Sequence, residues 1–480
     1  CPHTMASNNT KEEGDNKGSL QQFISDNKLT IATVIACGVL AYYAFKSKRP
    51  SVAVQDTKQC CDHNNKMKVV ERMEEKKDEC GACDNNIEYA TPMDAYRNGR
   101  REKLLYTTAT RTDNEDAPDA TDMIAVVDVD PNSPTYCQII SQVNVGKGEE
   151  VHHSGWNACA SCYGMAGFNR KYLVVPAFTS GNIHFIDVSN ARKPRLHKTV
   201  SGAMIKEKYG LSYPHTTHCL ANGKIMVSFL GVDAKHEQNK VNNGADFLWI
   251  DENLQVESRW VKHAEQRPTY GYDYWYQPYH NVMISTEWGT PKAFSTGFNP
   301  AHVQKKMYGN AIHIWDWSEH TLIKKITFDE SQVCMPLEIR FLHDPKSGHA
   351  FCGAALTSNI IHIYKDSKTK EWTANADYIQ VEAIEMANWA LPAMPGLVTD
   401  VLLSMDDKYM YFSNWLHGDI RQYDISDPLH PRLNSRCFVG GSLRADSGFK
   451  IKDTSKNPVP SVPKVKGKRI EGGPQMLQLS

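Results

Sequence analysis

The sequence lacks an excess of charge of either sign. Its 54 lysines and arginines are nearly balanced by 55 aspartates and glutamates, which gives a formal net charge of −1 over 480 residues. A protein that attracts the phosphate backbone through its overall field needs a basic excess. The composition therefore gives no support for nucleic acid as a partner.

The sequence also lacks a dense cluster of cysteines and has few acceptor sites for N-glycosylation. The 13 cysteines are an odd number scattered from Cys1 to Cys437, unlike the dense disulfide framework of a small secreted domain. Asn8-Asn9-Thr10 is the only Asn-x-Ser/Thr sequence in the chain. Both features favour a reducing compartment. A content of 41% hydrophobic and 23% charged residues allows a large folded core.

An uncharged run follows the polar amino-terminal tail, residues 1–28. Residues 29–45, LTIATVIACGVLAYYAF, are just long enough to span hydrocarbon, and Lys28 and Lys46 flank them. The run predicts a single transmembrane helix, with a buried helix as the alternative. A cleaved signal peptide is disfavoured because the preceding tail is long and acidic and no small-residue cleavage site follows.

The charges around this run predict its orientation. Lysines and arginines on its carboxyl side outnumber the lone Lys28 on the other side, which predicts a cytoplasmic position for the domain that follows. Residues 46–88 are rich in charge and poor in apolar residues, which predicts a linker. The expectation is therefore a single-pass membrane protein, or a cytosolic protein if the run does not insert.

From residue 104 onward one pattern recurs: two apolar runs, of which the second ends in Asp before a polar turn. Two copies match in register over eleven residues, IDVSNARKPRL at 186–196 and YDISDPLHPRL at 423–433. The copies end at Asp128, Asp187, Asp251, Asp316, Lys365 and Asp424, 49 to 65 residues apart. Short β-branched runs at this spacing predict a β-propeller, with a solenoid or separate sandwiches as the alternatives.

We predict an all-β protein with a seven-bladed propeller over residues 89–480. Six marked units are visible, and the closing residues GPQMLQLS resemble the first strand of a further unit. A seventh blade is therefore expected to begin at about residue 474 and to be incomplete at the carboxyl end.

The repeat places several polar residues at one end of the central channel, where the first strands of the blades begin. Imidazole binds copper, zinc, iron or nickel, so histidines beside carboxylates on this face predict a metal site, with structural histidines as the alternative. The candidate ligands are His152, His153, His215, His218 and His417, and the carboxylates are Asp273, Glu338 and Asp400.

The cysteines of the folded part admit several interpretations. Cys159 and Cys162 have the Cys-x-x-Cys spacing of zinc or redox pairs, but they do not precede a helix in a βαβ unit, so a thioredoxin-like role is disfavoured. A soft-metal site and a labile disulfide both stay open. Cys137 begins a predicted strand and by itself indicates only a small apolar residue.

Long stretches of the chain resemble the selenium-binding protein, or methanethiol oxidase, family. They include VDVDPNSPTYCQII, HHSGWNACASC, PHTTHCL, GYDYWYQPYHNVMISTEWGTP, PLEIRFLHDP, MPGLVTDVLLSMDD and YFSNWLHGDIRQYDISDP. The resemblance covers about residues 80–480. It implies a seven-bladed propeller and a copper-dependent oxidation of methanethiol by dioxygen and water to formaldehyde, hydrogen sulfide and hydrogen peroxide.

The resemblance also implies site residues. It places the copper ligands on His152 and His153 and on His215 or His218, and it places selenium on Cys137. Members of the family continue past the position of Ser480 to a further histidine, so the copper site of this chain is incomplete if that histidine is a ligand. One of the three channel carboxylates is expected to act as the general base.

Two functions follow from these predictions. The first is a membrane-tethered copper enzyme whose partners are a small thiol, dioxygen and the membrane through residues 29–45. The second is a non-enzymatic selenium- or thiol-binding scaffold that offers the propeller surface to protein partners in traffic or redox signalling.

Overall fold

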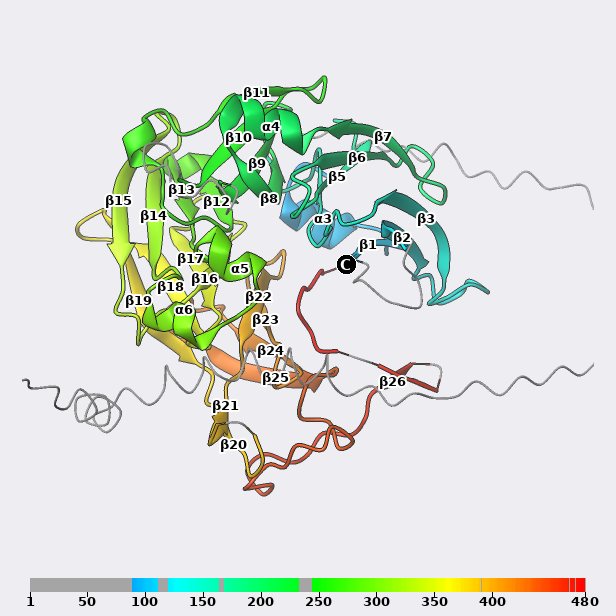
Figure 1. The fold of residues 1–480 in the computed structure, drawn as a ribbon, viewed down its shortest axis with the longest axis vertical. Helices are drawn as coiled ribbons and strands as arrows, with labels where there is room; N and C mark the ends of the chain where they lie inside the picture. The colour runs from blue at the N-terminus through cyan, green and yellow to red at the C-terminus, as the bar shows by residue number, and fades with distance from the viewer. Residues whose placement is uncertain are drawn as a thin grey trace, which may run out of the picture.

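Six antiparallel sheets arranged around a common centre form the body of the protein (Figure 1). The computed structural model describes residues 89–110, 120–163, 168–232, 244–389, 391–465, 467–470 and 472–479. The first sheet has three strands, β1 (Leu104–Ala109), β2 (Asp122–Asp128) and β3 (Ile139–Gly146). Each of the other five has four strands in chain order, which is the arrangement of propeller blades.

The four-stranded sheets follow one another along the chain. Their strands are β4 (Gly155–Trp156), β5 (Tyr172–Pro176), β6 (Ile183–Asp187) and β7 (Arg195–Val200); β8 (Ser212–Cys219), β9 (Ile225–Gly231), β10 (Asp246–Ile250) and β11 (Val256–Arg259); β12 (Tyr274–Gln277), β13 (Val282–Ser285), β14 (Ala311–Asp316) and β15 (Thr321–Thr327); β16 (Pro336–Phe341), β17 (His349–Ala354), β18 (Asn359–Lys365) and β19 (Trp372–Gln380); and β22 (Val398–Leu403), β23 (Tyr409–Asn414), β24 (Asp419–Asp424) and β25 (Arg432–Phe438).

Short elements fill the connections. They are the helices α3 (Pro92–Asn98), α4 (Gly202–Tyr209), α5 (Pro291–Ser295) and α6 (Pro300–Gln304), the single 3₁₀ turns η1 (Ala264–Gln266) and η2 (Pro278–His280), and the two-stranded ribbons β20 (Ile384–Glu385) with β21 (Ala393–Met394) and β26 (Lys464–Val465) with β27 (Lys468–Arg469).

Burial changes from the centre of each sheet to its outer edge. Every residue of β9 and β13 is buried, whereas six of the seven residues of β25 are exposed. Apolar side chains of neighbouring sheets pack face to face, as Ile284, Ile312 and Phe341 do between β12–β15 and β16–β19. The first strand β16 contacts the first strands β12 and β22 of the blades on either side. The sheets therefore share their cores pairwise, and polar residues can gather at the centre.

The sequence repeat marks the end of one strand in each blade. Asp187, Asp316 and Asp424 are the last residues of β6, β14 and β24, and Asp251 directly follows β10. Each carboxylate accepts a hydrogen bond from the backbone N–H two residues on. Such Asx turns close the chain after a strand, which explains why the repeat ends in Asp. The repeat interpretation is confirmed.

The predicted number of blades was wrong. The described residues form six blades, and the segment expected to begin a seventh, residues 472–479, pairs with no strand among them. It lies between the β22–β25 sheet and the β1–β3 sheet (Figure 1). The side chain of Thr399 donates to the carbonyl of Gln475 at 2.8 Å, and the N–H of Leu477 donates to Asp400 Oδ2 at 2.6 Å. A single extended segment held by β22 is not a blade.

The prediction of a transmembrane helix is corrected as well. In the part of the chain that the structure describes, no helix is long and apolar enough to cross a membrane. The longest, α4, has 8 residues, whereas a crossing takes about 20. The predicted anchor over residues 29–45 lies outside the described residues, as do the tail and the linker before residue 89. The membrane partner and the single-pass location are therefore not retained.

Candidate metal centre

Three histidines converge at the inner ends of two neighbouring blades. His152 and His153 precede β4, and His215 lies in β8. The ring centroids of His153 and His215 are 3.9 Å apart, and the ring of His152 lies 5.2 Å from the first and 5.4 Å from the second. One ligand nitrogen of each ring lies within 4.8 Å of the other two. Three imidazoles at these separations can share one ion.

Two of these rings each have a nitrogen without a hydrogen-bond partner. The Nε2 atoms of His152 and His215 are buried and have no hydrogen-bond partner. The Nδ1 atom of His215 lies 3.2 Å from the hydroxyl of Thr216, which orients the ring. An unpaired buried polar atom costs free energy unless a ligand satisfies it. The donors are one imidazole nitrogen from each of three histidines, a set that suits copper, zinc, iron or nickel.

A bulge in β8 aims His215 at the other two histidines. The pairing of β8 with β9 shifts register between Pro214 and Thr217, so His215 and Thr216 stand in the irregular part. Tyr213, just before it, has φ 60, which a tyrosine rarely adopts. Bulges re-aim side chains and are frequent beside active sites. The irregular backbone of β8 thus orients the side chain of His215 toward the other two histidines.

Gly155 brings β4 close enough to β8 for the histidines to meet. A Cβ atom at this position would lie 2.7 Å from the carbonyl oxygen of Thr217 and 2.9 Å from its Cγ2. The backbone of β4 can therefore lie against β8 only while residue 155 has no side chain.

We expect Gly155→Ala to lower the free energy of unfolding by roughly 1–3 kcal/mol, the usual cost of overpacking, because the new methyl group meets backbone. It should also weaken metal binding, since His153 would move away from His215. Urea unfolding and metal titration measure the two effects. Ser154→Ala, at the exposed neighbouring residue, is the matched control. Equal stability of the two variants would contradict the close approach.

Burial keeps the imidazoles neutral. It lowers the pKa of His152 to about 4, and together with the neighbouring His152 it lowers the pKa of His153 to about 3. Burial, and next the charge of His153, lowers the pKa of His215 well below its usual value. Neutral imidazole is the form that binds a metal. At pH 7 all three histidines are therefore ready to act as ligands.

Next to the histidines, a half-buried arginine gathers the three carboxylates predicted from the sequence. Arg340 Nη1 lies 2.7 Å from Asp273 Oδ2, and its Nη2 lies 2.9 Å from Glu338 Oε2 and 3.9 Å from Asp400 Oδ1. The carboxyl groups of all three are at most 2% exposed. The side chain of Arg340 also covers the ring of Trp275 at 4.9 Å. One cation thus faces three acids drawn from β12, β16 and β22 or their ends.

The three acids differ in their protonation. Burial and the adjacent Asp273 raise the pKa of Glu338 well above its usual value. Burial raises the pKa of Asp400 to about 6, although Arg340 acts in the opposite direction. Burial would also raise the pKa of Asp273, but the charges of Arg340 and His218, together with hydrogen bonds from Glu338 and the backbone of Ile339, outweigh it, and the net pKa is lowered. At pH 7 Asp273 and most of Asp400 are therefore ionised, and Glu338 keeps its proton to a higher pH than an ordinary glutamate does.

Tyr272 lies between the two groups. Its ring centroid is 4.2 Å from that of His215 and 6.4 Å from that of His153, and the next residue is Asp273. The negative charges of Glu338, Asp273 and Asp400 contribute, after burial, to raising the pKa of its hydroxyl. The histidines and the carboxylates therefore form adjacent parts of one polar centre.

The structure leaves the remaining predicted residues out of the histidine trio. His218 packs against Trp275, and His417 donates to the carbonyl of Met394 at 2.9 Å in the turn after β23. Cys137 is exposed in the turn before β3, with φ 58. Cys159 and Cys162 meet Cys219, as described below. The histidine trio was thus the part of the predicted ligand set that assembles.

Sequence reasoning missed Arg340 and Cys219. Arg340 stands two residues after Glu338 in PLEIRF, and residues two apart share one face of a strand, so its spacing carried a signal. Cys219 follows His218 in the stretch already singled out for its histidines. Its partners Cys159 and Cys162 are 57 or more residues earlier, and only the packing of two blades joins them.

Comparison with known proteins identifies the family. Residues 83–480 match the family described as 56kDa selenium binding protein (SBP56). The chain belongs to this family. Selenium-binding protein 1 of Arabidopsis thaliana is 47% identical over 395 residues, which are 82% of this chain and 78% of that protein.

Other members carry an enzyme name. Methanethiol oxidase of Mus musculus is 46% identical over 397 residues, covering 82% of this chain and 81% of that protein. A crystal structure of a hypothetical selenium-binding protein from Sulfolobus tokodaii superposes with a TM-score of 0.67 at 32% identity, over 74% of this chain and 78% of that one. These relatives confirm the family resemblance and the prediction of a methanethiol oxidase-like oxidoreductase.

Proposed function

We propose that the chain oxidises methanethiol with dioxygen and water to formaldehyde, hydrogen sulfide and hydrogen peroxide, using copper held by His152, His153 and His215. The reaction balances when one molecule each of methanethiol, dioxygen and water gives one molecule of each product. The observation that carries the proposal is the convergence of three neutral imidazoles with two buried, unpaired Nε2 atoms. The relative from Mus musculus named methanethiol oxidase supplies the substrate.

Copper at this position would supply a Lewis acid for the thiol and a redox centre for dioxygen. The protein's own part is to move protons beside it. Asp400, ionised at pH 7, accepts a proton from the methyl carbon or from water. Glu338, whose pKa burial and Asp273 raise, donates one. Asp273 holds Arg340, which keeps the three carboxyl groups together.

Asp400 sets a pH dependence. A base with a pKa of about 6 is protonated and inactive below that pH, so kcat/KM should rise as the pH increases through about 6 and then level off. Asp400→Asn should lower kcat by about 100-fold and remove this rise. The pH profile of hydrogen sulfide release measures both effects. An unchanged profile in the variant would assign the base to another residue.

Copper content and product analysis test the function itself. The full chain is purified, loaded with Cu²⁺, and assayed for hydrogen sulfide, formaldehyde and hydrogen peroxide. We expect one copper per chain at the histidines and equal amounts of the three products. A folded, copper-loaded protein that releases none of them would overturn the proposal and favour the second candidate.

That candidate is a non-enzymatic selenium- or thiol-binding scaffold. The exposed thiol of Cys137 and relatives named selenium-binding protein support it. Selenite bound in a 1:1 ratio by the inactive protein, and lost in Cys137→Ser, would establish this function in place of the oxidase.

A further inference from the structure

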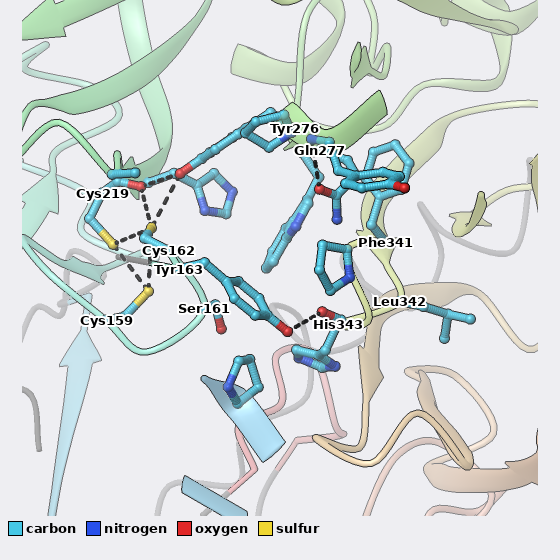
Figure 2. Close-up of a pocket in the computed structure, with 17 residues that line it drawn as sticks. Cys159, Ser161, Cys162, Tyr163, Cys219, Tyr276, Gln277, Phe341, Leu342 and His343 are labelled. Atoms are coloured by element: carbon cyan, nitrogen blue, oxygen red, sulfur yellow. Dashed lines mark hydrogen bonds between the residues drawn. The ribbon is translucent and has the colours of Figure 1, made fainter. Parts of the chain in front are cut away.

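A second cluster of metal-binding side chains lies away from the histidines. The Sγ atoms of Cys159 and Cys219 are 3.1 Å apart, those of Cys162 and Cys219 are 3.3 Å apart, and those of Cys159 and Cys162 are 3.7 Å apart. Figure 2 shows the three sulfur atoms pointing at one another. Cys162 and Cys219 are buried, and Cys159 is half-buried. We call these residues the cysteine triad.

We propose that the cysteine triad binds one thiophilic d¹⁰ cation, the class of Zn²⁺ and Cu⁺, with a coordination position left open to the adjoining cavity. Zinc bound to thiolates at about 2.3 Å in tetrahedral geometry holds its sulfur atoms about 3.8 Å apart. The triad's separations would lengthen by at most about 0.7 Å to reach this value. Three converging ligands with one open position are the arrangement of an accessible metal site.

A disulfide explains the cluster less well. A disulfide bond is about 2.05 Å long and joins only two sulfurs. The third thiol, Cys219, comes from a different blade and lies as close to its partners as they lie to each other. A redox pair needs no third thiol at this distance, whereas a metal ion needs at least three ligands to be held firmly.

The backbone and a tyrosine fix the triad. Cys159 and Cys162 stand in a turn closed by the N–H of Cys162, which donates to the carbonyl of Cys159 at 3.3 Å. The hydroxyl of Tyr276 donates to the carbonyl of Cys219 at 2.6 Å and lies 3.2 Å from Cys162 Sγ. The turn and the end of β8 are therefore held in register by β12 of a third blade.

The fourth side of the triad faces a cavity of about 350 Å³. Its lining includes Trp275 and Tyr279. Phe341 and His343, labelled in Figure 2, also line it. This volume admits a small thiol or a short peptide side chain. A cation in the triad would thus be reachable by a small sulfur ligand without unfolding of the blades.

This site is independent of the proposed oxidase centre. His215 and Cys219 both lie on β8, four residues apart, which places them about 13 Å from each other along a strand. The ligand nitrogens of the histidine trio and the sulfur atoms of the triad form separate groups. The proposal does not rest on methanethiol oxidation, and it stands if that activity is absent.

Cobalt absorption tests the proposal. Co²⁺ replaces Zn²⁺ and gives an intense thiolate-to-metal charge-transfer band that imidazole ligands do not give. The reduced full chain is titrated with Co²⁺ without oxygen, and Zn²⁺ or Cu⁺ is then added to displace it. We expect the band to saturate at one equivalent and to be displaced by at least one of the two ions. His153→Ala should keep the band, because it alters only the histidine centre.

Single cysteine variants locate the ligands. Cys219→Ser should lower the affinity for Co²⁺ at least about 10-fold, and Cys159→Ser, at the half-buried position, should do the same with less risk to folding. Cys437→Ser, at an exposed cysteine of β25, is the matched control and should bind as the original chain does. No band in the original chain, a band that survives both triad variants, or an isolated protein with a Cys159–Cys162 disulfide and no bound metal would each overturn the proposal.

Discussion

Replacing His215 by alanine should remove bound copper and methanethiol oxidation together. The variant loses one of three converging imidazoles and leaves two rings that no longer enclose an ion. We expect the copper affinity to fall by more than about 100-fold, beyond the roughly 10- to 100-fold that loss of a supporting residue costs. Turnover should fall to the rate of the copper-free protein. Copper per chain and hydrogen sulfide release measure the two effects.

His197→Ala is the matched control for this variant. His197 is an exposed histidine on β7 that stacks on Tyr172, with ring centroids 5.0 Å apart. Neither residue belongs to the metal centre. The control should retain copper and turnover. His153→Ala should behave as His215→Ala does, because its ring lies against that of His215. Full copper content in either ligand variant would place the ion elsewhere.

Arg340→Met should lower the free energy of unfolding more than the substitution of any other single side chain of the centre. It removes the only cation within 4 Å of three buried carboxyl groups in the described centre and leaves them to repel one another. Breaking a buried ion pair by removing one partner typically costs about 3–5 kcal/mol. We expect a loss of this size at pH 8, measured by urea unfolding.

The loss should shrink at lower pH. Without the arginine, the pKa values of Glu338 and Asp400 rise further and that of Asp273 rises above its value in the unfolded chain, so the folded variant binds extra protons as the pH falls. Its stability relative to the original chain should therefore recover between about pH 8 and pH 5. Arg432→Met, which breaks the exposed pair with Asp424, should cost at most about 1 kcal/mol at either pH. A loss of the same size in both variants would contradict the role of Arg340.

The blades could be predicted because each repeats a local signal. The Asp that ends one strand of a blade forms its turn from the adjacent residues, so the signal is complete within a few positions. The number of blades could not be counted in this way. Residues 474–479 resemble the first strand of a blade, but a sheet requires partner strands, and the described segment is held by side chains of β22 and β23 without pairing with a strand.

The candidate site was predictable where neighbouring residues define it and not where packing does. The repeat placed His152, His153 and His215 on one face, and the structure brings them together. The same reasoning put His218 and His417 with them, but a bulge in β8 and a turn after β23 send those rings elsewhere. A bulge shifts the alternation of side chains, and sequence alone does not show where it occurs.

The alternation in β8 also determines which changes of chain length the protein can accept. His215 lies in the irregular part of β8 and Cys219 in the regular pairing that follows, so deleting or inserting one residue between them would turn every later side chain to the opposite face. The Asp-closed turns at the outer strands carry no such constraint. Length variation among members of the family should therefore collect at those turns and be absent between residues 215 and 219, and loop grafts for engineering belong at the rim.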